Sequence, residues 1–111
     1  LVMKCKKIKH FEGLIRNFHT LPNKVKKTII ANIDPVLLKL ICEFCQNVLQ
    51  RNVPLTKEKF SKLKKYKLLL KDLANKSIAD RKKVLKLKGS GFFIPLLFSV
   101  ITPLLSKLIG G

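Results

Sequence analysis

The spacing of apolar residues is the feature that most constrains how this chain folds. Between residues 57 and 75, apolar side chains recur every three or four positions, with lysines at most of the positions between them. The apolar positions are Phe60, Leu63, Tyr66, Leu69, Leu70 and Leu73. This period gives an α-helix one apolar face. Similar patterns cover residues 4–18, 24–33, 34–50 and 80–88, so the sequence predicts an all-α fold, a small bundle of about five short helices.

The helix over residues 34–50 is predicted to be the most buried. Asp34 is placed to cap its first turn, and Pro35 suits the first helical position, where an N–H group has no partner within the helix. After the capping Asp34, only Lys39 and Glu43 are charged in this helix, and its apolar residues form one broad stripe. They are Leu37, Leu38, Ile41, Cys42, Cys45, Val48 and Leu49.

Capping residues also mark the start of two later helices. Thr56 precedes the basic pattern that begins at Lys57, and its hydroxyl can accept a hydrogen bond from the first turn. Ser77 and Asp80 have the spacing of a capping box, which predicts Ser77 as the N-cap of the last basic helix.

The balance of charge indicates the class of partner. The chain has 24 Lys and Arg residues against 6 Asp and Glu, a formal net charge of +18 in 111 residues. A chain this basic repels itself unless a polyanion neutralises it. Residues 57–88 hold 13 basic and 3 acidic residues, a net charge of +10. A solubilising surface uses mixed signs, so this region is predicted to bind a polyanion, nucleic acid first and anionic membrane second.

Lysine far outnumbers arginine, which bears on what is recognised. Arg16, Arg51 and Arg81 are the only arginines, and the other 21 basic residues are lysines. Lysine neutralises phosphate as a point charge, whereas bidentate reading of guanine favours arginine. The sequence therefore predicts salt-dependent binding to the backbone of a nucleic acid, without sequence selectivity, and leaves DNA versus RNA open. The predicted phosphate-binding residues are Lys57, Lys59, Lys62, Lys64, Lys65, Lys67, Lys71, Arg81, Lys82, Lys83, Lys86 and Lys88.

The cysteines are three in number, Cys5, Cys42 and Cys45, which does not indicate a disulfide framework. Cys42 and Cys45 have CxxC spacing, which allows a redox pair or half of a zinc site. Further zinc ligands would have to come from Cys5, His10 and His19, near the start of the chain. Because the CxxC pair lies in the apolar stripe of a predicted helix, both cysteines are interpreted as small core residues. No metal and no cofactor is predicted, and a reducing, intracellular compartment is favoured.

The sequence lacks the patterns that carry catalysis or secretion. It has no glycine-rich phosphate loop, no Ser-His-Asp arrangement and no pair of carboxylates in one predicted cleft. Its six acidic residues are scattered, which leaves little for general acid–base chemistry. Four lysines between residues 4 and 9 interrupt any apolar stretch that would form a signal peptide. The chain is predicted to be neither an enzyme nor secreted.

The composition changes abruptly at Gly89-Ser90-Gly91. No charged residue occurs from residue 89 through residue 106, and the glycines are interpreted as a hinge. The chain is therefore predicted to have two parts, a basic helical domain over residues 1–88 and a hydrophobic C-terminal tail over residues 89–111. The apolar run approaches the roughly 20 residues that span a bilayer, although Pro95 and Pro103 weaken a continuous helix.

Two roles for the tail stay open. The tail either anchors the protein to a membrane or to another protein, or it folds back onto the helical domain. In the first case the anchoring residues are Phe92, Phe93, Ile94, Leu96, Leu97, Phe98, Ile101, Leu104 and Leu105.

Two stretches resemble known families. Lys88-Gly89-Ser90-Gly91-Phe92-Phe93-Ile94-Pro95-Leu96-Leu97 resembles the junction of the adenovirus core protein ten, the mu precursor, where a basic DNA-condensing stretch precedes an apolar segment. Asn47-Val48-Leu49-Gln50-Arg51-Asn52-Val53-Pro54-Leu55-Thr56, with the lysine-rich region and tail after it, is similar to small open reading frames of Polinton (Maverick) and adintovirus elements. The resemblance covers about residues 34–109, and the chain departs from the adenovirus proteins in using lysine in place of arginine.

The resemblance implies a minor virion core protein that packages or tethers double-stranded DNA. Its tail would face capsid protein or act on membrane, and its location would be the virion interior and the host nucleus. Two other functions stay open on the residues themselves. One is a membrane-active protein whose lysines meet anionic lipid while the tail inserts. The other is a helical adaptor that binds an acidic protein partner.

Overall fold

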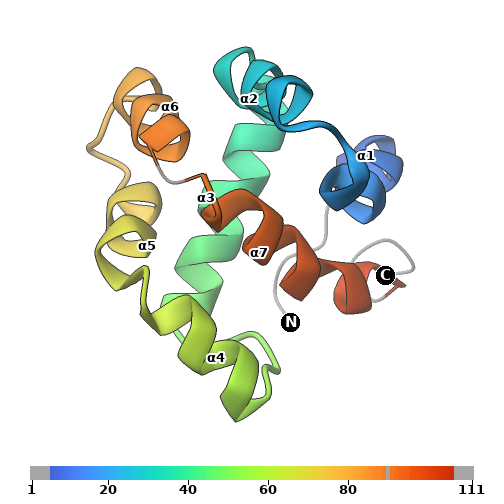
Figure 1. Ribbon diagram of the computed structural model, residues 1–111. Coiled ribbons are helices and arrows are strands. Elements are labelled where there is room, and N and C mark those ends of the chain that lie inside the picture. Colours follow the sequence, from blue (N-terminus) through green and yellow to red (C-terminus); the bar gives the residue numbers. More distant parts are fainter. Residues whose placement is uncertain (1–5, 90, 107–111) are drawn as a thin grey trace.

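The computed structural model describes residues 6–89 and 91–106, with side chains from residue 8 onward, and Figure 1 shows their arrangement. Seven α-helices and three 3₁₀ helices make up this part of the chain, which contains no strand, so the predicted all-α fold class is confirmed. In chain order the elements are η1 (Lys6–Phe11), α1 (Glu12–Asn17), η2 (Phe18–Thr20), α2 (Asn23–Ala31), α3 (Pro35–Leu49), α4 (Lys57–Lys64), α5 (Lys67–Ala74), α6 (Asp80–Gly89), α7 (Phe93–Ile101) and η3 (Thr102–Leu104). In Figure 1, α3 runs through the middle of the molecule, with α1 and α5 on opposite sides of it.

The helix count exceeds the predicted five because one long pattern is broken and the tail adds a helix. The single helix expected over residues 57–75 is two helices, α4 and α5, joined at Lys65 and Tyr66. Tyr66 leaves the helical conformation with φ −106° and ψ 26°, and its N–H donates to the Leu63 carbonyl at 2.9 Å. The bend lets α4 pack on α7 while α5 packs on α3.

α3 begins as its sequence predicts. Asp34 Oδ1 accepts a hydrogen bond of 2.7 Å from the Val36 N–H, and Pro35 occupies the first turn. The Asp34 side chain thereby satisfies one of the backbone donors that a helix start leaves without a partner.

The buried face of α3 is broader than the predicted stripe. Eight of its 15 residues are buried, and they include Leu40, Phe44 and Asn47, which lie outside that stripe. Leu49 was expected in the core and is 36% exposed instead. The difference arises because α3 packs against both α5 and η1, which buries more than one side of the helix.

The apolar tail contributes α7 to the core. Six of the nine residues of α7 are buried, a larger fraction than in α3, so α3 is not the most buried helix by that measure. The Phe93 and Tyr66 rings lie 5.4 Å apart between centroids, and the Phe98 ring meets Phe18 edge-on at 5.1 Å. Between residues 93 and 105, the tail therefore lies on the helical domain and shares its hydrophobic core.

The connection between α6 and α7 has no geometric need for glycine. Gly89 is the last residue of α6, and neither Gly89 nor Gly91 lies in the left-handed region of φ. A Cβ atom built at either position would meet no other atom within 4 Å. Alanine would fit at both positions, so the predicted glycine hinge is not confirmed.

The two predicted caps have different outcomes. Thr56 caps α4, because its hydroxyl oxygen accepts a hydrogen bond from the Lys59 N–H at 3.3 Å. The capping box at Ser77 is wrong, because α6 begins only at Asp80. Ser77 instead donates from its N–H and its hydroxyl to Asn75 Oδ1, at 2.9 and 2.7 Å. The Asn75 side chain forms a local turn that competes with the cap.

Candidate nucleic-acid interface

Four helices that carry most of the positive charge lie next to one another. α2, α4, α5 and α6 hold 14 of the 24 basic residues. α6 contacts both α2 and α5, and only two residues separate α4 from α5. In Figure 1 they lie around α3, from α2 at the top through α6 and α5 on the left to α4 at the bottom. We call the basic residues of these helices, together with Lys65 and Lys76, the basic arc.

Most of the predicted phosphate-binding residues are exposed and, among the residues that the structure describes, unpaired. Eight of the twelve are exposed and take part in none of the ion pairs of the described chain. They are Lys57, Lys64, Lys65, Lys67, Lys71, Arg81, Lys82 and Lys88. Lys59 is half-buried, Lys62 pairs with Glu58 at 3.6 Å, and Lys86 pairs with Asp72 at 2.7 Å. The positive charge of the arc is thus compensated locally at two positions.

Lys83 does not lie where its predicted role requires. It is only 6% exposed, and it lies beside Cys42 of α3, so it is not presented to a phosphate as its exposed neighbours are. Burial raises the pKa of the Cys42 thiol, and the nearby Lys83 ammonium opposes that rise. Burial raises the pKa of Cys45 well above its usual range, and this residue has no exposed surface. Protonated, buried thiols are poor nucleophiles and poor metal ligands, so Cys45 serves the core.

Two parts of the interface were missed by the sequence reasoning, and the first is α2. Lys24, Lys26 and Lys27 join the basic arc because α2 packs on α6, which is far away in the chain. Three lysines within four positions of an amphipathic helix were visible as a signal. The contact between α2 and α6 was not, because nothing local specifies it.

The second missed part is Arg51, just after α3. Its backbone φ is 56°, and its guanidinium carbon lies 5.5 Å from the centroid of the Phe60 ring. Arg51 and Phe60 both line two cavities of about 350 and about 280 Å³, and Lys64 and Lys67 border the smaller one. Arg51 therefore adds a guanidinium group beside α4 and α5.

A basic groove lies where α2 meets the junction of α6 and α7. Its volume is about 450 Å³, and its lining residues are Phe18, Asn23, Lys26, Lys27, Ile30, Lys88, Gly91 and Phe92. Lys26 is half-buried, with its Nζ atom 5.9 Å from the centroid of the Phe18 ring. Phe92 is 82% exposed at the edge of the same space. We call this feature the Phe92 groove.

The other residues predicted to anchor the tail lie mainly inside the molecule. Phe93, Ile94, Leu97, Phe98, Ile101, Leu104 and Leu105 are buried, and Leu96 is half-buried. Within the described residues no single helix is long and apolar enough to cross a membrane. One bent pair, α6 with α7 continued through Leu104, meets the criteria of length and composition together.

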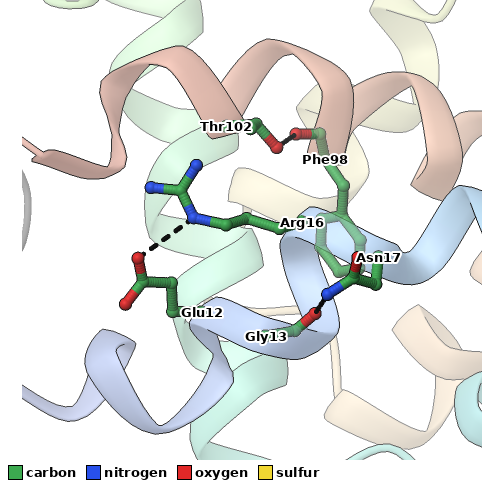
Figure 2. A network of polar contacts seen from close by, with 6 residues as sticks. All are labelled: Glu12, Gly13, Arg16, Asn17, Phe98 and Thr102. Atoms are coloured by element: carbon green, nitrogen blue, oxygen red, sulfur yellow. Dashed lines mark hydrogen bonds and ion pairs between the residues drawn. The ribbon is translucent and has the colours of Figure 1, made fainter.

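The polar contacts within α1 and at the end of α7 do not form a site of converging groups. Figure 2 shows Arg16 paired with Glu12 at 3.0 Å, and hydrogen bonds of 2.9 Å from Asn17 to the Gly13 carbonyl and 2.7 Å from Thr102 to the Phe98 carbonyl. Each contact joins residues four positions apart, either within α1 or from the start of η3 back to α7, so none of them links α1 to α7. No group of three or more His, Cys, Asp or Glu side chains in the described chain is placed to hold a metal ion.

Comparisons of the chain with protein-family models, with curated proteins and with solved structures found no match. The candidate interface is defined by the charges and geometry of this chain alone. It consists of the basic arc, with the Phe92 groove near α2 and Arg51 near α4.

Proposed function

We propose that this protein binds double-stranded DNA through the phosphate backbone, without reading sequence, and condenses it as a core or minor virion protein of a virus or viral element. The observation that supports this best is the adjacency of the four basic helices, together with the eight predicted residues of the basic arc that are exposed and free of the described ion pairs. Lysines in such an arrangement neutralise phosphates independently of base identity.

The size of the molecule matches its charge. Its Cα atoms extend over 31 Å along the longest axis, and duplex DNA carries one negative charge per roughly 1.7 Å of axis. One molecule laid along the duplex therefore covers a length that carries roughly 18 charges, and its own formal charge is +18. A complex close to neutrality removes the repulsion between neighbouring DNA segments, which is what condensation requires.

The membrane alternative places an extra requirement on the fold. Six of the nine residues of α7 are buried, so insertion of the tail into a bilayer would first expose the core. The adaptor alternative uses the same basic arc, with an acidic protein in place of DNA.

The test is a titration into two unrelated labelled duplexes across a salt series. The key variant is Lys67→Gln with Lys71→Gln, which removes two exposed lysines of α5. The matched control is Lys9→Gln with Lys39→Gln, which removes the same charge from exposed lysines of η1 and α3 that lie outside the basic arc and take part in none of the described ion pairs. We expect equal affinity for both duplexes and a steep loss of affinity with salt. In a plot of the logarithm of the binding constant against the logarithm of the salt concentration, the slope should be smaller in magnitude by about 2 for the α5 variant than for the unmodified protein, and unchanged for the control.

Several outcomes would contradict the proposal. An affinity that does not change with salt concentration, or that is much higher for one duplex than for the other, would exclude binding by neutralisation of the DNA phosphates. Equal effects of the two double variants would mean that total charge, and not the arc, controls binding. A partner protein captured equally well after nuclease treatment would favour the adaptor, and leakage of anionic vesicles in the absence of DNA binding would favour the membrane function.

A further inference from the structure

We infer that the Phe92 groove binds an unpaired nucleotide, with the base stacked on the Phe92 ring and the flanking phosphates held by Lys26, Lys27 and Lys88. This inference rests on the proposed function and deepens it. The basic arc would bind any polyanion of suitable length. The groove would add a site that distinguishes single-stranded nucleic acid from duplex.

The position of Phe92 sets it apart from other exposed apolar residues. A single exposed apolar side chain is common on protein surfaces and needs no explanation. Phe92, however, is 82% exposed while its neighbour Phe93 is fully buried, so the helix start presents one ring outward and one inward. The outward ring borders a groove that also contains three lysines. Aromatic rings within a positively charged groove are the arrangement that binds single strands.

The lysines of the groove come from two helices and are partly fixed in place. Lys26 and Lys27 belong to α2, and Lys88 belongs to α6. The contact of Lys26 with the Phe18 ring holds its ammonium group by a cation–π interaction. Ile30, which is 6% exposed, adds an apolar side chain to the lining. A volume of about 450 Å³ lies within the range of small-ligand sites.

The groove favours an unpaired base for a steric reason. Within a duplex both faces of every base are covered by its neighbours, so a protein ring reaches a face only if the base is flipped out. In a single strand the base faces are accessible, and stacking tolerates any sequence because every base has such a face. The Phe92 ring can then stack on the base of a nucleotide while the lysines of the groove bind the phosphates that flank it.

The experiment uses a tryptophan reporter, because the chain contains no tryptophan. The fluorescence of the full-length Phe92→Trp variant is followed during titration with a short oligothymidylate, a hairpin duplex and inorganic polyphosphate. Stacking of a base on the indole predicts strong quenching by the oligothymidylate. Polyphosphate and duplex are expected to bind with little quenching, because neither offers a free base face.

Affinity measurements on two further variants complete the test. Phe92→Ala removes the ring, and Phe92→Leu keeps an apolar side chain that cannot stack. We expect both to lower the affinity for oligothymidylate about tenfold and to leave the affinity for duplex within about twofold. Their melting temperatures should match that of the unmodified protein, since the ring is exposed.

The failure of this inference differs from the failure of the proposed function. Unchanged oligothymidylate affinity in Phe92→Ala, with duplex binding intact, would overturn the inference alone. Equal quenching by polyphosphate would do the same. A fluorescence change with anionic vesicles and none with oligothymidylate would assign Phe92 to lipid. Absence of binding to both single strands and duplexes by the unmodified protein would overturn both proposals.

Discussion

Arg51 holds a backbone conformation that usually belongs to glycine. The Arg51 N–H donates to the Val48 carbonyl at 3.1 Å, and the Asn52 N–H donates to the Asn47 carbonyl at 2.9 Å. These two bonds form the Schellman motif that ends α3, with Arg51 at the left-handed position. A residue with a Cβ atom is less stable there by about 1 kcal/mol. The contact of the guanidinium with Phe60 offsets part of that cost.

We predict that Arg51→Gly is more stable than Arg51→Ala by about 1 kcal/mol. Both variants lose the contact with Phe60 and one positive charge, so their difference isolates the backbone strain at φ 56°. Urea unfolding of the two variants measures this difference. Equal stability would show that the left-handed conformation imposes no strain on this turn. DNA affinity should fall equally in both, because the charge is lost in both.

At the scale of elements, α7 decides whether the tail belongs to the core. Phe98 is 3% exposed and packs edge-on against Phe18, whereas the adjacent Ser99 is exposed. We predict that Phe98→Ala lowers the free energy of unfolding by about 3–5 kcal/mol, and that Ser99→Ala changes it by less than about 0.5 kcal/mol. Urea denaturation followed by circular dichroism measures both. A small loss in Phe98→Ala would mean that α7 spends little time on the helical domain.

The elements with local signals were predictable from the sequence. Asp34 and Pro35 determine the start of α3 through a hydrogen bond and a fixed φ, both local effects. The break at Tyr66 has no such signal, because the apolar pattern continues through it and only the packing of α4 and α5 on different helices favours the bend. The tail was ambiguous for another reason. An uncharged apolar run satisfies a bilayer and a protein core equally well.

The candidate site was predictable in composition but not in detail. Lys82 and Lys83 are adjacent and chemically identical, yet Lys82 is exposed and Lys83 is buried, because α6 turns one of them toward α3. Phe92 and Phe93 differ in the same way at the start of α7. In both pairs the rotation of a helix about its axis decides the role, and that rotation depends on the whole core.

At the scale of the molecule, the charge opposes the fold. The described chain contains three ion pairs, all at the surface, against a formal net charge of +18. Surface pairs of this kind each stabilise by less than about 1 kcal/mol. The repulsion among the lysines of the basic arc therefore has little internal compensation, and the ionic environment should control stability.

We predict that the melting temperature rises with sodium chloride and rises further with inorganic polyphosphate. Salt screens the repulsion in the folded state, and a bound polyanion stabilises that state by mass action. The melting temperature of the Lys67→Gln, Lys71→Gln variant should depend less on salt than that of the unmodified protein. The melting temperature of the Lys9→Gln, Lys39→Gln variant should depend on salt nearly as much as that of the unmodified protein. A melting temperature that is independent of salt would show that self-repulsion does not limit stability.

The packing of α7 also has a consequence for the synthesis of the protein. Phe18 and Tyr66 find their aromatic partners in Phe98 and Phe93, which the ribosome adds only after all of α1 to α6. Chains lengthen at about 5–20 residues per second, so the helices made first wait for seconds with exposed apolar faces and a high positive charge. A message truncated before the codon for Phe93 would yield a chain without its closing helix, open to proteases. Translation through α7 thus becomes a condition for the protein to accumulate.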